Sequence, residues 1–231
     1  MKKYMLAFSL PMLVSLLSAV QVYAHGVDNE DAELIAREGS FYEKMFDFLW
    51  LGTKHMLTGY DHLLFILGIV FLLANFRDVV KYISYFTIGH SITLIIATLA
   101  GITFNYYIVD AIIGLSVLYK GYDNLFDAKT KFKIPFDMKW IIFAFGLVHG
   151  FGLSTRLQAL HLPENNLFAY IMSFNVGVEI GQIIVLAVFV WALNYYRKHQ
   201  SFNHFKIYAN QGLIGAGVFL FLVGIINAIL N

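Results

Sequence analysis

The chain has 231 residues, of which 59% are hydrophobic and only 13% are charged, and its mean hydropathy is +0.67. So few polar side chains cannot cover a water-soluble globule, and the composition therefore predicts an all-α polytopic membrane protein. The net charge of +1 argues against a nucleic-acid partner, and the absence of cysteine excludes disulfides and thiolate metal sites.

The first 24 residues have the pattern of a secretory signal peptide. Lys2 and Lys3 precede an apolar run over residues 5–20. Residues 22–24 match a signal-peptidase cleavage site, because they end with the small residue Ala24. We therefore expect the mature chain to begin at His25. An uncleaved anchor helix is the alternative, because the apolar run is close to the lower length limit for a span.

Residues 25–58 are expected to form an exported segment. Its first part, 25–40, is polar and acidic, and helical spacing of apolar residues over 41–57 predicts an amphipathic helix on the outer membrane–water boundary. Residues 59–231 then form a six-helix transmembrane domain. Its predicted spans are 59–75, 79–100, 107–126, 139–160, 167–194 and 207–230.

The basic residues predict the topology of these spans. With an exported amino terminus, the connections after the first, third and fifth spans face the cytoplasm. These connections and their flanks hold ten Lys and Arg residues, whereas the outer connections hold only Arg156, as the positive-inside rule requires. We expect a multi-pass protein of the bacterial inner membrane, with the mature amino and carboxyl termini both outside.

Ionisable side chains inside the apolar segments are the main functional signal. His62, His90 and His149 lie in three different predicted spans, and Asp61 and Glu179 add two carboxylates. Each such residue costs about 2.5–3.5 kcal/mol on insertion scales, so they are rare and usually functional. With nitrogen and oxygen donors only, they predict a site for a divalent transition metal, with Ni, Co and Zn as candidates. A polar cluster that holds the helices together or relays protons is the competing interpretation.

His55 and Asp61 have two possible roles beside His62. His55 precedes His62 by seven residues, two turns, so both share one face if the helix is continuous. The Asp61 side chain points about 100° away from that of His62 around the helix axis. It can orient a histidine on a neighbouring helix, as metal-bound imidazoles usually require, or it can bind the metal directly.

Other polar residues are candidates for orienting the ligands or for lining the pathway to the site. Asn175, Glu179 and Gln182 share one face of an otherwise apolar helix. Asp110 either lines the approach or lies in interfacial water. The full set of residues in these two roles is His55, Asn175, Gln182, Asp110, Thr87, Ser91 and Ser116.

His25 is a separate candidate. If cleavage follows Ala24, the new α-amino group and the His25 imidazole form a chelating pair for copper or nickel. The alternative is an exposed side chain without a function.

At these residues the chain resembles the HupE/UreJ family of polytopic bacterial membrane proteins. His55, followed after five residues by Asp61 and His62, matches the first-span motif of that family. Four further blocks extend the resemblance: 61–65 (DHLLF), 89–93 (GHSIT), 145–152 (FGLVHGFG) and 174–182 (FNVGVEIGQ). Together they resemble a divergent second branch of the family. The resemblance implies a nickel or cobalt permease.

The sequence departs from the metal-permease branch of that family at two positions. That branch has a histidine four residues before the equivalent of His149 and a glutamate three residues after it, where this chain has Phe145 and Gly152. Glu179 could supply the missing carboxylate from another helix.

Three functions compete at this stage. The first is a secondary metal permease with a site near the bilayer midplane. The second is an intramembrane metalloenzyme, a zinc-type hydrolase, which is favoured by the scarcity of polar residues in the predicted inner half. The third is a scaffold that delivers metal to a partner. Besides the metal ion and the bilayer, the possible partners are a second copy of the chain and a protein that matures a metalloenzyme.

Overall fold

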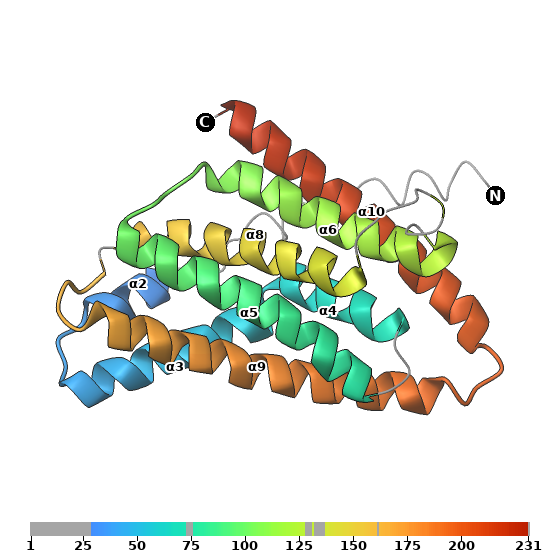
Figure 1. Cartoon of the computed structure of the whole chain (residues 1–231), viewed down its shortest axis with the longest axis horizontal. Coiled ribbons are helices and arrows are strands. Elements are labelled where there is room, and N and C mark those ends of the chain that lie inside the picture. Colours follow the sequence, from blue (N-terminus) through green and yellow to red (C-terminus); the bar gives the residue numbers. More distant parts are fainter. Residues whose placement is uncertain (1–28, 73–75, 128–130, 132–136, 161, 231) are drawn as a thin grey trace.

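The computed structural model describes residues 29–72, 76–127, 131, 137–160 and 162–230, and throughout these ranges the regular structure is helical (Figure 1). The predicted signal peptide and His25 lie outside them. Four described helices are long and apolar enough to cross a membrane. They are α5 (Phe76–Ala100), α8 (Met138–Gln158), α9 (Leu167–Tyr196) and α10 (Phe202–Leu230).

The remaining helices are shorter or more polar. α6 (Tyr106–Phe126) coincides with the predicted third span but carries three charged side chains, Asp110, Lys120 and Asp123. α2 (Asn29–Ala36) and α3 (Phe41–Thr58) precede α4 (Tyr60–Leu72), an apolar helix of 13 residues. The six predicted spans therefore correspond to four long apolar helices, one charged helix and one short helix.

The helix predicted to be amphipathic, α3, packs lengthwise along α9. α3 and α4 follow one another along α9 with a break at Gly59 (Figure 1). At one end the rings of Phe41 and Tyr170 lie 5.8 Å apart, and at the other end Arg197 donates a 2.9 Å hydrogen bond to the carbonyl of Val70. Together α3 and α4 thus match the length of α9.

Two charged residues of α3 are buried in contacts with α2 and the residue that follows it. Lys44 and Asp47 face α2 and its flank instead of water. The Lys44 ammonium donates to the Ile35 carbonyl at 2.5 Å, and Asp47 accepts two hydrogen bonds from Arg37. Lys44 and Asp47 therefore belong to an internal contact between α3 and α2.

Glycines set how closely the helices pair. A Cβ atom on Gly177 of α9 would lie 2.0 Å from the Leu49 carbonyl oxygen of α3, and one on Gly146 of α8 would lie 2.1 Å from the Phe86 oxygen of α5. α6 and α10 pair in the same way. Such close approach of backbones is typical of helix pairs in membranes.

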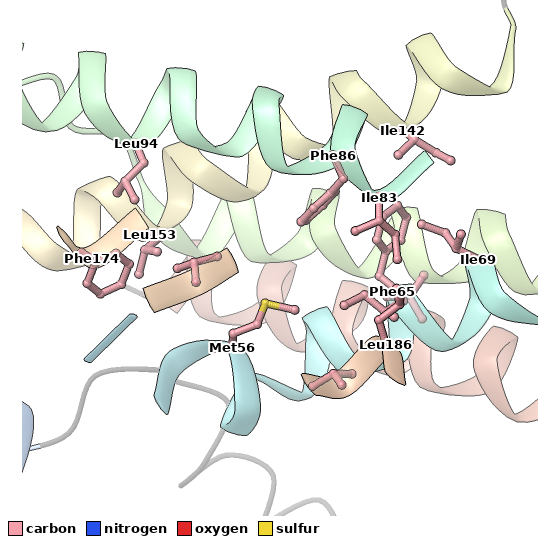
Figure 2. Packing of buried hydrophobic residues seen from close by; sticks show 14 of the residues in the cluster. Met56, Phe65, Ile69, Ile83, Phe86, Leu94, Ile142, Leu153, Phe174 and Leu186 are labelled. Atoms are coloured by element: carbon pink, nitrogen blue, oxygen red, sulfur yellow. The ribbon is translucent and has the colours of Figure 1, made fainter. Parts of the chain in front are cut away.

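The bundle has two distinct ends. α3, α6 and α9 begin at one end, where α5, α8 and α10 finish (Figure 1). We call this the Arg156 end and the opposite end the Arg197 end. Between them an apolar core runs from Leu94 and Leu153 past Phe86 to Ile69 and its neighbours (Figure 2).

The glycine contacts generate a stability prediction. Gly177→Ala places a methyl group against the α3 backbone, and overpacking of this kind is expected to destabilise the protein by about 1–3 kcal/mol. Gly212→Ala, where a Cβ meets nothing within 4 Å, is the matched control and should be neutral or stabilising. Thermal unfolding in detergent measures both, and equal melting temperatures for the two variants would contradict the α3–α9 packing.

Candidate metal centre

The break between α3 and α4 brings His55 and His62 together. α3 ends at Thr58, and Gly59 turns the chain with φ −69° and ψ 98° before α4 begins. A Cβ atom at Gly59 would lie 2.9 Å from the His55 oxygen and 3.1 Å from His62 Nδ1, so glycine fits here best. The two imidazole centroids lie 4.9 Å apart. Their proximity comes from this break and not from one continuous helix.

Four helices contribute imidazoles to one cluster, which we call the histidine centre: His55 from α3, His62 from α4, His90 from α5 and His149 from α8. Each of the four is at most 8% exposed. One ring nitrogen each of His55, His62 and His90 lies within 4.8 Å of the other two. His149 joins through His62, since their ring centroids lie 5.0 Å apart.

Two of the imidazoles are oriented by hydrogen bonds at Nδ1. The Asp61 carboxylate lies 3.0 Å from His62 Nδ1 and also accepts from the His62 backbone N–H at 2.9 Å. The Phe145 carbonyl lies 2.9 Å from His149 Nδ1. With a proton on each Nδ1, the Nε2 lone pairs are available to a metal, as is usual for metal-bound histidine. Asp61 thus orients its own neighbour and not a histidine of another helix.

The remaining nitrogens of the cluster are buried. Within the described residues, Nε2 of His62, Nε2 of His149 and both ring nitrogens of His90 have no hydrogen-bond partner. A buried polar atom without a partner costs about 1–3 kcal/mol. Coordination of a cation would satisfy several of these atoms at once, and such a group of donors therefore suits a metal.

A small cavity adjoins the histidine centre toward the Arg156 end. Its volume is about 20 Å³, enough for one water molecule or one ion. The residues that line it include His55, Asp61, His62, Asp110 and Arg156. An Asp110–Arg156 ion pair, formed between α6 and α8, lies at this cavity.

Aromatic side chains close the opposite side of the centre. Phe65 lies 5.1 Å from Phe86 and 5.7 Å from Phe145 between ring centroids, and Phe86 lies 4.9 Å from His149. Figure 2 shows Phe65 and Phe86 together in the core. We call Phe65, Phe86 and Phe145 the aromatic layer. It separates the histidine centre from the Arg197 end.

The structure does not bring Glu179 to the histidine centre. Glu179 is exposed and lines an open groove of about 580 Å³ between α5 and α9, together with Thr87, Ser91 and Gln182. Thr87 donates a 2.5 Å hydrogen bond to the Gln182 side chain. Of the polar stripe on α9, Glu179 thus faces the groove, whereas Asn175 and Gln182 are buried.

Two further candidates form hydrogen bonds within their own helices. Asn175 donates to the Ile171 carbonyl at 2.9 Å, and Ser116 donates to the Ile113 carbonyl at 2.7 Å. Arg156, in contrast, was not among the predicted site residues, because the sequence analysis counted it only as the basic residue of the outer connections. Only the pairing of α6 with α8 places it at the cavity.

The hydrogen bond from Asp61 predicts an effect on metal affinity. Asp61→Asn should weaken Ni²⁺ binding by about 10–100-fold, because the amide no longer holds the correct His62 tautomer as firmly. Titration calorimetry of the purified protein measures this change. His204→Ala, on an exposed part of α10, is the control. Equal affinity of the Asp61 variant and the wild type would contradict the orienting role.

The position of Glu179 generates a second prediction. His55→Ala should lower Ni²⁺ affinity more than Asp61→Asn does, whereas Glu179→Gln should leave it unchanged within error. Equilibrium dialysis with Ni²⁺ measures the affinity of all three variants. A loss of affinity in Glu179→Gln, with wild-type affinity in His55→Ala, would restore Glu179 as a ligand and remove His55.

Comparison with known proteins identifies the family of the chain. The profile of the family described as HupE / UreJ protein matches residues 29–225, which include all four histidines of the centre. No match is found among curated proteins or solved structures. The family resemblance expected from the sequence is thus confirmed, and the chain is a member of the HupE/UreJ family of membrane proteins, which are generally related to nickel and cobalt transport.

Proposed function

We propose that the protein is a secondary permease for a divalent transition-metal cation, with Ni²⁺ or Co²⁺ as the transported ion. The observation that carries this proposal is the histidine centre, where ring nitrogens of His55, His62 and His90 lie within 4.8 Å of one another inside a bundle of apolar helices. Membership of the HupE/UreJ family supports the choice of metal.

The spacing of the donors suits a metal after a small adjustment. Imidazole nitrogens bind such ions at about 2.0–2.1 Å, so in a tetrahedral site two of them are about 3.4 Å apart. Side-chain movements of about 1 Å would bring the three nitrogens from within 4.8 Å of one another to that spacing. His149 is positioned to supply a fourth nitrogen, and nitrogen ligands suit Ni, Co and Zn.

The broken helix supports transport in particular. Transporters often bind their substrates near the bilayer midplane at discontinuous helices. Non-helical backbone is tolerated at that depth only inside the protein or beside a cavity, and Gly59 meets both conditions. In the predicted topology, the Arg156 end faces outward, and the cation enters past Asp110 and Asp61.

Release requires the aromatic layer to open toward the Arg197 end, which faces the cytoplasm of the bacterial inner membrane in this topology. Metal ions bind deprotonated ligands, so protonation of the histidines would favour release. We identify no nucleotide-binding motif in the sequence. An ion gradient or trapping of the metal by a downstream protein would then drive uptake.

The metalloenzyme and scaffold hypotheses use the same centre. A cavity of about 20 Å³ holds a catalytic water but leaves no room for an organic substrate, which favours the permease over a hydrolase. A scaffold that delivers metal to a maturation partner would bind the ion without moving it across the membrane.

Uptake into proteoliposomes separates these possibilities. The wild type should accumulate radiolabelled Ni²⁺, and His62→Ala and His90→Ala should each reduce the rate to the level of empty liposomes, because the central ligands are lost. His204→Ala should transport normally. Tight binding without uptake would reject the permease and leave the scaffold or the enzyme.

A further inference from the structure

Four polar side chains are buried between the aromatic layer and the Arg197 end. They are Lys120, Asp123 and Asn124 on α6 and Asn210 on α10, and each is at most 7% exposed. We call them the inner polar cluster. The sequence places Lys120 among the positive charges that flank the cytoplasmic connections, but the structure leaves its side chain only 1% exposed.

Hydrogen bonds connect the cluster to α4. The Asn124 amide donates to the Gly68 carbonyl at 2.8 Å and to the Asn210 side-chain oxygen at 2.7 Å. These two acceptors fix the orientation of the amide. They leave Asn124 Oδ1 buried and without a partner among the described residues. An unpaired buried carbonyl oxygen is the kind of atom that a cation satisfies.

Asp123 provides the charge of the cluster. The Lys120 ammonium lies 3.1 Å from the Asp123 carboxylate and 3.9 Å from the Met138 sulfur of α8. A buried ion pair of this kind contributes little net stability, because desolvation offsets the attraction between the charges. Stability alone therefore does not account for two buried charges in α6.

Ring contacts connect this cluster to the histidine centre. The Tyr119 ring, next to Lys120 in sequence, lies 5.9 Å from the Phe145 ring, and Phe145 belongs to the aromatic layer that contacts His149. A cation that leaves the histidines through this layer would next meet Asp123. The half of the bundle that appeared apolar from the sequence thus contains a polar site.

We propose that the inner polar cluster is a second cation site, in which the Asp123 carboxylate and Asn124 Oδ1 bind the transported divalent metal through oxygen. When no metal ion is bound, the Lys120 ammonium occupies this position, and an arriving metal ion displaces it. This inference rests on the proposed permease function and extends it, because it supplies an exit site on the Arg197 side.

The double variant Lys120→Met/Asp123→Asn tests the site in the full-length protein. Replacing a buried ion pair by uncharged groups is often neutral for folding, so the variant should be stable. We expect Ni²⁺ uptake into proteoliposomes to fall by at least about tenfold, while Ni²⁺ affinity at the histidine centre stays within about twofold of the wild type. The matched control is Lys139→Met/Asp137→Asn, which removes an exposed ion pair at the same end of the bundle.

Lys120→Met alone provides an independent measurement. Without the competing ammonium, Asp123 should bind metal at equilibrium, and dialysis with Ni²⁺ should show a second bound ion per chain that Asp123→Asn removes. If the single variant fails to fold in a thermal-shift assay, Ni²⁺ uptake by the double variant still tests the inner site. Uptake by the double variant at the wild-type rate would overturn the inner site, whereas absence of uptake by the wild type would overturn the permease function itself.

Discussion

Burying an imidazole nitrogen without a hydrogen-bond partner costs about 1–3 kcal/mol, and the helices that meet at Gly59 bury several such nitrogens against one another. Asp61 and the Phe145 carbonyl accept hydrogen bonds at Nδ1 of His62 and His149, and among the described residues no donor reaches the lone pair on Nε2 of either ring. The arrangement is reasonable for a bundle that receives a cation and unfavourable for one that does not. This is the physical basis of the proposed cation site.

Close backbone contact makes this arrangement possible. α3 approaches α9 at Gly177, and α5 approaches α8 at Gly146, so that the helices holding His55, His90 and His149 are fixed by rigid pairs. α4 lies among these pairs and contacts α3, α5, α6, α9 and α10. Because α4 is short and begins at the break, its first turn can present His62 to the histidines of the other helices.

The sequence indicates much of this fold and part of the site. Rare ionisable residues in apolar segments identified His62, His90 and His149, and the structure brings these three into one cluster. Spacing alone could not show the break at Gly59, which brings His55 into the cluster, nor that Glu179 faces a groove beside α5. Periodicity shows which residues share a helix face, but the neighbour of that face depends on tertiary packing. Arg156 and Lys120 were missed for the same reason.

X-ray absorption at the nickel edge, on purified protein with one equivalent of Ni²⁺, tests the central claim most directly. The account predicts at least three imidazole nitrogens at about 2.0–2.1 Å, with the multiple scattering typical of histidine rings. The His62→Ala variant should lose part of that signal, because His62 contacts the rings of His55, His90 and His149. A shell of oxygen ligands alone, unchanged in the variant, would contradict a metal centre built from these histidines.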